Sequence, residues 1–121
     1  MKKLISFALL LALSLPAYGV TFKKGHDLLD ACKEVIKHQE GLDFHAVKAG
    51  ECFGYITSVN DTSNLWADWR DFERSFCIPD GTKIGRLIFV VVDHLEAHPE
   101  QLQLDASSLA TNSFQKTFPC N

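Results

Sequence analysis

Four cysteines limit the folds that are open to this chain of 121 residues. Cys32, Cys52, Cys77 and Cys120 follow one another at spacings of about 20, 25 and 43 residues, without a CxxC pair. Zinc sites and redox dithiols place their cysteines closer together. An even number of cysteines in a small chain that leaves the cytoplasm predicts two structural disulfides instead.

The N-terminus has the composition of an export signal. Met1-Lys2-Lys3 is basic, residues 4–15 are apolar, and the small residues Ala17 and Gly19 fit a cleavage site after Gly19. The apolar run is shorter than the roughly 20 residues of a membrane span, so an uncleaved anchor is the less favoured alternative. We expect a signal peptide at residues 1–19 and one mature domain at residues 20–121 in the periplasm, without membrane insertion.

The mature chain is expected to be acidic. Removing Lys2 and Lys3 from the 12 basic residues leaves 10 against 15 acidic ones, so the formal charge moves from −3 to −5. Such a surface repels phosphate backbones, and no basic cluster longer than Lys23-Lys24 offsets it. Nucleic acid is therefore not an expected partner.

Apolar residues recur at helical spacing along the mature chain, which predicts an all-α fold of four to five helices. Residues 84–95 are rich in β-branched side chains. The run is longer than a usual strand and has no partner with an alternating pattern, so we predict a buried helix. Residues 60–64 are turn formers and are expected to separate two helices. The predicted helices span residues 24–39, 44–60, 65–77, 84–95 and 100–116.

Some residues are expected to define helix ends and close contacts. Gly41 is interpreted as the stop signal of the first helix, and Gly54 as a site of tight helix packing. Thr82 follows the turn at residues 79–81 and is expected to cap the next helix. Pro99 is expected in the first turn of the last helix, whose predicted inward residues are Leu102, Leu104, Ala106, Leu109, Ala110 and Phe114.

An up-and-down arrangement of these helices favours one disulfide pairing. A continuous helical path from Cys52 to Cys77 would span roughly 35 Å, although a turn at residues 60–64 could fold it back. Cys32 lies near the end of the bundle where Cys52 begins its helix, and Cys120 returns to the end that holds Cys77. We predict Cys32–Cys52 and Cys77–Cys120, whose loops would contribute roughly 3 and 4 kcal/mol to stability.

No catalytic or metal site is predicted. His94 and His98 are four residues apart, a spacing that lets two imidazoles share a metal, but no third ligand is implied and we interpret both as solvent-facing. The carboxylates of Asp68, Asp71 and Glu73 lie near arginines, so ordinary ion pairing explains them. Because the cysteines are expected to be oxidised and no serine has a nucleophile motif, we expect no enzyme activity and no cofactor.

Four aromatic residues, Trp66, Trp69, Phe72 and Phe76, lie within eleven positions of the sequence. Core packing is the default interpretation of such a cluster. The alternative is an exposed aromatic face for dimerisation or a partner protein, because Trp and Tyr are favoured anchors of interfaces.

Four short runs together resemble one family. They are Cys52-Phe53-Gly54-Tyr55-Ile56, Phe76-Cys77-Ile78-Pro79-Asp80-Gly81, Val90-Val91-Val92-Asp93-His94-Leu95-Glu96-Ala97-His98-Pro99-Glu100 and Phe118-Pro119-Cys120. In this order and spacing they resemble the Rap/Tai family of periplasmic immunity proteins, which protect bacteria against peptidoglycan amidases delivered by type VI secretion. The resemblance implies an all-helical, disulfide-bonded protein, often a homodimer, that occludes the active-site cleft of an amidase effector without catalysis.

The contacts with this effector are expected in exposed polar loops, because such loops can enter a cleft. The predicted contacts are Asp61, Thr62, Ser63, Asn64, Glu96, His98, Glu100 and Gln101. One alternative function is a small periplasmic acid-stress chaperone of the HdeA type, which would expose apolar surface at low pH. Another is a small lytic or hydrolytic enzyme, for which the sequence offers no nucleophile.

Overall fold

The structure, a computed structural model, describes residues 23–121. In this part of the chain the helices are α2 (Gly25–Gln39), α3 (Ala46–Arg70), α4 (Ile84–Ala97), the 3₁₀ helix η1 (Pro99–Gln101) and α5 (Ala106–Thr117). The predicted all-α fold is confirmed. The predicted signal peptide and its cleavage after Gly19 lie outside the described residues. Among residues 23–121, none of the helices has the length and apolar character that crossing a membrane requires.

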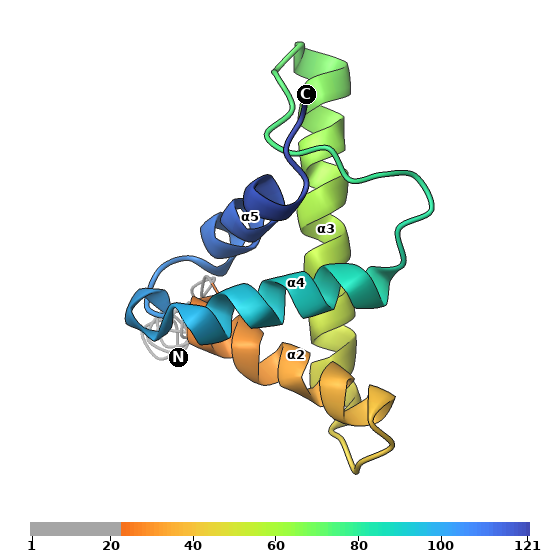
Figure 1. Cartoon of the computed structure of the whole chain (residues 1–121), viewed down its shortest axis with the longest axis vertical. Helices are drawn as coiled ribbons and strands as arrows, with labels where there is room; N and C mark the ends of the chain where they lie inside the picture. Colours follow the sequence, from red (N-terminus) through yellow and green to blue (C-terminus); the bar gives the residue numbers. More distant parts are fainter. Residues whose placement is uncertain (1–22) are drawn as a thin grey trace, which may run out of the picture.

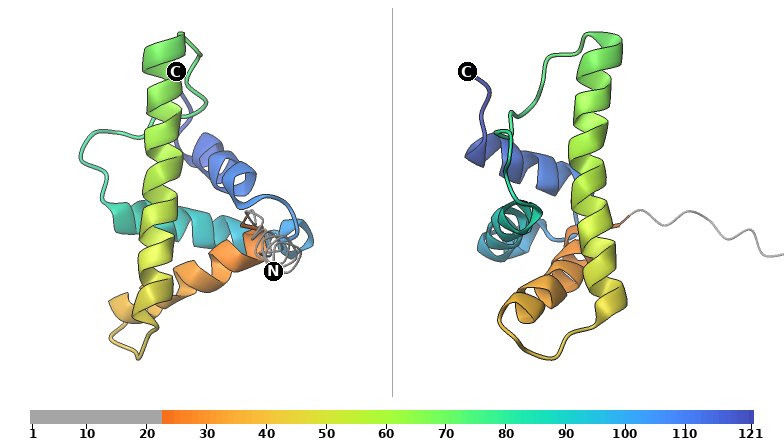
Figure 2. Two further views of the ribbon diagram at one scale, coloured as in Figure 1. Left: turned by 180° about the vertical axis from the view of Figure 1, so that it is seen from behind. Right: turned by 90° about the vertical axis from the view of Figure 1, so that its right-hand side faces the viewer.

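The long helix α3 organises the arrangement of the others. In Figure 1, α2 and α4 lie across one half of α3, while α5 approaches it further along. Figure 2 shows in the side view that α2, α4 and α5 all lie on the same side of α3. The helices therefore cross α3 instead of running up and down beside it, and within residues 23–121 no helix packs against the opposite side of α3.

The core forms where α2, α4 and α5 meet the first half of α3. Leu28, Ile56, Ile88, Leu95 and Phe114 are among its largest fully buried side chains. The apolar run in residues 84–95 is helical, as predicted, because a helix at the centre of the packing buries several of its faces at once.

Helix α3 is continuous where the sequence predicts two helices separated by a turn at residues 60–64. In a helix, Asn, Asp, Ser and Thr each cost only a few tenths of a kcal/mol relative to Ala, which is less than the hydrogen bonds lost at a break. The helix ends at Arg70 because Asp71 has a φ of 56°, a left-handed conformation that Asp tolerates. Phe72 and Phe76, predicted to be helical, lie in the segment that follows.

The two glycine predictions have opposite outcomes. Gly41 has a φ of 73° directly after α2, so it is the stop signal that the sequence predicts. Gly54 does not lie at a tight helix contact, because a Cβ atom built at this residue would meet nothing within 4 Å. The same is true of Gly50. Both glycines therefore lie on open parts of α3.

The connection after η1 explains why α5 begins later than predicted. The carbonyl oxygens of Leu102 and Leu104 accept hydrogen bonds from His26 and Gly25 at the start of α2, at 3.0 and 2.9 Å. The first N–H groups of a helix have no partner within the helix, and here the carbonyl oxygens of Leu102 and Leu104 bind those of α2. These two carbonyl groups are therefore not used for hydrogen bonds within α5, which begins after them. Leu104, predicted to face inward, is 49 % exposed.

The segment before α4 forms the predicted turn but not the predicted cap. Gly81 has a φ of 80°, and the Thr82 N–H donates to the Pro79 carbonyl oxygen at 3.2 Å. The Thr82 hydroxyl also donates to this oxygen, at 2.6 Å. Lys83, and not Thr82, is the N-cap of α4.

Two disulfides link distant parts of the chain, in the pairs that the sequence analysis favours. Cys32–Cys52 joins α2 to α3 and is fully buried. Cys77–Cys120 joins the segment after α3 to the C-terminus, and both of its cysteines are exposed. No cysteine is free.

Candidate functional site

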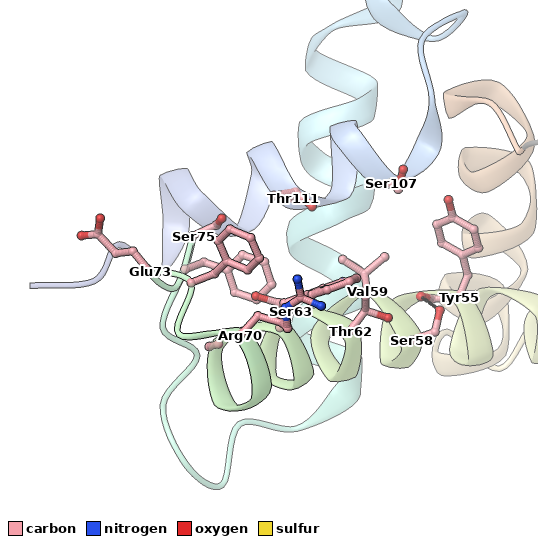
Figure 3. A pocket seen from close by; sticks show the side chains of 14 residues that line it. Tyr55, Ser58, Val59, Thr62, Ser63, Arg70, Glu73, Ser75, Ser107 and Thr111 are labelled. Atoms are coloured by element: carbon pink, nitrogen blue, oxygen red, sulfur yellow. Dashed lines mark hydrogen bonds between the residues drawn. The ribbon is translucent and has the colours of Figure 1, made fainter.

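An open groove lies between the second half of α3, the segment that follows it, and α5 (Figure 3). Its volume is about 860 Å³, within the range of about 300–1,000 Å³ that is usual for ligand pockets. The residues that line it are Tyr55, Ser58, Val59, Thr62, Ser63, Trp66, Ala67, Arg70, Phe72, Glu73, Ser75, Phe76, Ser107 and Thr111.

Four aromatic side chains, those of Tyr55, Trp66, Phe72 and Phe76, line the groove. Trp66 and Phe72 meet edge to face, with ring centroids 6.1 Å apart, and they are 48 % and 60 % exposed. Phe76 is buried and packs edge to face on Phe114 of α5, at 5.2 Å. The groove is thus continuous with the core below it and open to solvent above.

The aromatic cluster of the sequence is therefore only partly in the core. Core packing is correct for Phe76, but it is wrong for Trp66, Trp69 and Phe72, and Trp69 is 80 % exposed. Helix α3 has no buried residue after Ile56, so the rings of Trp66 and Trp69 stay at the surface, and Phe72 lies in the exposed segment that follows α3. For Trp66, Trp69 and Phe72 the structure therefore agrees with the alternative interpretation, an exposed aromatic face.

The groove contains one cation, Arg70. Figure 3 shows the Arg70 side chain turned into the groove and the Glu73 carboxylate pointing away from it. The guanidinium lies 6.0 Å from the centroid of the Trp66 ring. Arg70 forms no ion pair within residues 23–121, and the carboxylate of Asp68, on the same helix, pairs with Arg74 at 3.1 Å. The groove can therefore accept an apolar group that carries a negative charge.

The wall made by residues 72–76 is held at both ends. Asp71 ends α3 in its left-handed conformation, and at the other end Cys77 is bonded to Cys120. The N–H of Cys77 also donates to the Phe118 carbonyl oxygen at 2.8 Å. The exposed disulfide thus fixes one end of the wall that carries Phe72.

The first group of predicted contact residues does not form a loop. Asp61, Thr62, Ser63 and Asn64 lie within α3, because the turn predicted there is absent. Thr62 and Ser63 line the groove, whereas Asp61 and Asn64 do not.

The second group of predicted contacts lies at the end of α4. Glu96 pairs with Lys33 of α2 at 3.4 Å, His98 follows the last turn of α4, and Glu100 and Gln101 lie in η1. Figures 1 and 2 place this end of α4 far from the second half of α3. The fold therefore does not bring the two predicted groups together.

The interpretation of His94 as solvent-facing is wrong. His94 is 8 % exposed, and its Nε2 atom has no hydrogen-bond partner among the described residues. Its ring stacks on that of His98 at 4.3 Å, and the Nδ1–H of His98 donates to the His94 carbonyl oxygen at 2.7 Å. Burial lowers the pKa of His94 below its ordinary 6.5, and the nearby positive charges of His98 and Lys116 lower it further, against Asp93. Residues 23–121 hold no group of three or more potential metal ligands.

A cluster of charges that the sequence analysis did not identify joins α2 to the start of α3. The Glu34 carboxylate accepts hydrogen bonds from Lys37 Nζ and from the N–H of His45, both at 2.7 Å. These bonds hold the pKa of Glu34 below its ordinary value of 4.5. The Lys48 ammonium pairs with the Asp30 carboxylate and lowers its pKa. The cluster fixes the α2–α3 connection and takes no part in the groove.

Sequence reasoning missed most of the residues that line the groove. The sequence analysis interprets the segment of Arg70 as ordinary ion pairing. The exposed aromatic face, given there as an alternative, is the one sequence feature that pointed to the groove. Ser107 and Thr111 come from α5, more than thirty positions away, and reach the groove only through the crossing of α5 and α3. No local pattern could have identified them.

The chain was compared with protein families, with curated proteins and with solved structures. A family model described as Rap1a immunity proteins matches residues 24–120. No curated protein and no solved structure matches. The family match covers α2 to α5 and both disulfides. The chain belongs to the family of Rap1a immunity proteins.

Proposed function

We propose that this protein binds a peptidoglycan amidase effector of type VI secretion and inhibits it by occluding its active-site cleft. The observation that carries the proposal is the family match over residues 24–120, because membership implies an immunity protein against a secreted effector. The amidase as target and the occlusion of its cleft come from the sequence resemblance.

We further propose that the protein acts in the periplasm. Two disulfides fit an oxidising compartment, and the N-terminal 19 residues have the composition of a signal peptide. Peptidoglycan lies in the periplasm, so an inhibitor of an enzyme that cuts it has to be present in that compartment. Export is therefore part of the proposed mechanism.

Co-expression tests this function directly. The proposal expects an amidase to be encoded beside the gene; this amidase is sent to the periplasm with the full chain, and lysis is followed by turbidity. The full chain should prevent lysis, whereas a variant that lacks residues 1–19 should not, because it stays in the cytoplasm with reduced cysteines. Unchanged lysis with the full chain, at equal effector levels, would contradict the proposal.

The contact surface is proposed to include the exposed end of α4 and η1. Glu96 and Glu100 are exposed in this segment, and His98 between them is half-buried. Glu100→Arg should weaken inhibition of the purified amidase, and Glu40→Arg, an equal charge change at an exposed residue outside the groove and outside the predicted contacts, serves as the control. Equal inhibition by both variants and the wild type would remove this segment from the contact.

We also propose that the protein is a homodimer. The resemblance implies it, and the exposed Trp69, Leu65 and Val47 on α3 are compatible with an interface. Sedimentation equilibrium of the protein purified from the periplasm measures the mass directly, and a monomer at tens of micromolar would contradict this proposal.

A further inference from the structure

We propose that the groove between α3 and α5 binds the free C-terminal end of a partner polypeptide in an extended conformation. The terminal carboxylate binds Arg70, and an apolar last side chain packs against Trp66 and Phe72. This site is separate from the contact segment proposed at α4 and η1, which lies far from the second half of α3 (Figures 1 and 2). The inference goes beyond the proposed inhibition of an amidase and does not depend on it.

The groove has the length of a short peptide segment. It runs along α3 from Tyr55 to Arg70, with α5 on its other side (Figure 3). From the rise of an α-helix, this part of α3 is roughly 22 Å long. An extended chain covers such a distance with about six or seven residues.

Hydroxyl groups on both walls favour a peptide over an acyl chain. Thr62 lies on α3, and Ser107 and Thr111 lie on α5. Their hydroxyls form no hydrogen bond within residues 23–121, whereas the Ser58 hydroxyl donates to the Tyr55 carbonyl oxygen at 2.8 Å. A hydroxyl can both donate and accept, and each residue of an extended peptide carries one backbone donor and one acceptor. An acyl chain has no group that these hydroxyls could bind.

Arg70 favours an anionic group at one end of the groove. Its guanidinium is turned into the groove (Figure 3) and forms no ion pair within residues 23–121. The carboxylate of Glu73 points away from the groove (Figure 3), so it does not occupy this place. A guanidinium binds a carboxylate through two parallel hydrogen bonds, which makes a carboxylate the fitting group.

The position of the aromatic rings indicates that this carboxylate is a C-terminal one. The Arg70 guanidinium lies 6.0 Å from the centroid of the Trp66 ring, and Trp66 meets Phe72 edge to face. A ligand must therefore bring an apolar group and a carboxylate close together. In an extended chain, successive side chains point to opposite faces, so an acidic residue turns away from an apolar neighbour. In a C-terminal residue the carboxylate belongs to the backbone, directly beside the side chain.

The C-terminus of this chain does not have the required chemistry. It ends in Asn121, whose side chain is polar, and Cys120 before it is bonded to Cys77. A second copy would offer the same end. The occupant is therefore a different polypeptide, with an apolar last residue.

Tryptophan fluorescence measures the binding directly. Both tryptophans of the protein lie on the second half of α3, and Trp69 does not line the groove. The Trp69→Phe variant therefore leaves Trp66 as the single reporter. The probe is an acetylated six-residue peptide of Gly and Ser that ends in Leu with a free carboxylate. It should shift the Trp66 emission to shorter wavelength in a saturable way, and the same peptide with a C-terminal amide should bind about tenfold more weakly.

Variants in the same Trp69→Phe background assign the carboxylate to Arg70. Arg70→Gln should weaken the free-acid peptide about tenfold and make its affinity equal to that of the amide. Arg74→Gln is the matched control and should change neither affinity by more than twofold, because Arg74 pairs with Asp68 and does not line the groove. Phe72→Ala should weaken both peptides by the same factor, because it removes only an apolar contact. Circular dichroism checks that each variant is folded.

Several results would overturn the assignment. They are equal affinity for the free acid and the amide, equal effects of Arg70→Gln and Arg74→Gln, and no saturation at millimolar peptide. An amidated peptide with Asp two residues before the Leu, bound as tightly as the free acid, would assign the groove to an internal acidic segment instead. Decanoate that displaces the probe at a concentration below the dissociation constant of the probe would assign it to fatty acids. None of these titrations involves an amidase, so the co-expression experiment fails or succeeds independently of them.

Discussion

His94 shows how a single buried residue can make stability depend on pH. The imidazole is enclosed at the end of α4, with Nε2 unpaired among the described residues, so a proton there would have to be buried without a partner. Its pKa in the folded state is therefore lower than in the unfolded chain. The unfolded state binds the proton more readily, which makes acid a destabilising condition.

This pKa shift predicts a loss of stability on acidification. The contribution of neutral His94 is fully present above pH 6.5, the ordinary histidine value, and it decreases as the pH falls below 6.5 toward the lowered folded pKa. Melting temperatures between pH 7.5 and pH 5 should therefore fall, and His94→Leu should flatten this dependence. His26→Gln, at an exposed histidine, should leave the slope nearly unchanged. An equal slope in wild type and His94→Leu would show that another group is responsible.

Gly25 is a second residue whose role follows from its surroundings. A Cβ atom there would lie 2.5 Å from Leu109 Cδ1 and 3.0 Å from the backbone of Leu102. The first turn of α2 thus approaches the connection before α5 too closely for a side chain.

Gly25→Ala should lower the free energy of unfolding by about 1–3 kcal/mol, the usual effect of overpacking. Gly50→Ala is the matched comparison, because its Cβ would meet nothing within 4 Å in the single chain. It should raise the stability by roughly 0.5–1 kcal/mol through helix propensity. Urea denaturation measures both, and the same sign for the two variants would contradict the packing described for Gly25.

Among the helices, α3 departs most from local expectation. Its second half contains no buried residue after Ile56, and it continues through five consecutive turn-forming residues. Helix formation is cooperative, and the helix is already formed at Cys52. Each residue that extends it therefore gains one backbone hydrogen bond for the conformational entropy that it loses. The result is a projecting arm that carries both tryptophans of the protein.

A proline in this arm tests whether α3 is continuous. Asp61→Pro removes a backbone donor and introduces a clash in a helix interior, so it should destabilise the protein by roughly 3 kcal/mol and reduce the helical signal in circular dichroism. Asp61→Ala should be neutral or slightly stabilising. If residues 60–64 formed a turn, proline would be tolerated and the two variants would behave alike.

At the scale of the whole molecule, two disulfides stabilise different parts. Cys32–Cys52 lies in the core between α2 and α3, whereas Cys77–Cys120 is exposed and holds the groove wall and the C-terminus together. Removal of the first should affect global folding, and removal of the second should act mainly on the groove.

Hydrogen exchange separates these two effects. Replacing Cys77 and Cys120 by Ala should increase exchange chiefly in residues 71–83 and 118–121, with α2 and α4 still protected. Replacing Cys32 and Cys52 by Ala should lower protection throughout, with a loss of roughly 3 kcal/mol by the loop-closure relation. A uniform loss of protection in both variants would contradict this division.

Much of the fold follows from local patterns in the sequence. The apolar stripe in residues 24–39, the stop at Gly41 and the length of the apolar run at residues 84–95 each specify a helix, because helical period and chain termination are local properties. The even number of cysteines likewise specifies covalent cross-links. The aromatic residues of the groove were visible as a cluster, but their local spacing fits a core stripe as well as a surface.

Tertiary structure alone decided where those patterns lead. Residues 60–64 continue α3 because the helix is anchored at Cys52. Residues 102–104 are not part of α5, because the carbonyl oxygens of Leu102 and Leu104 accept hydrogen bonds from the first N–H groups of α2. Trp66 and Trp69 stay exposed because the packing of the other described helices buries α3 only at Ala49, Cys52 and Ile56, in its first half. Burial depends on which elements meet, and contacts such as that of Phe76 with Phe114 join residues far apart in the chain. Sequence period therefore determined the helices, whereas their crossing determined the core, the groove and the open side of α3.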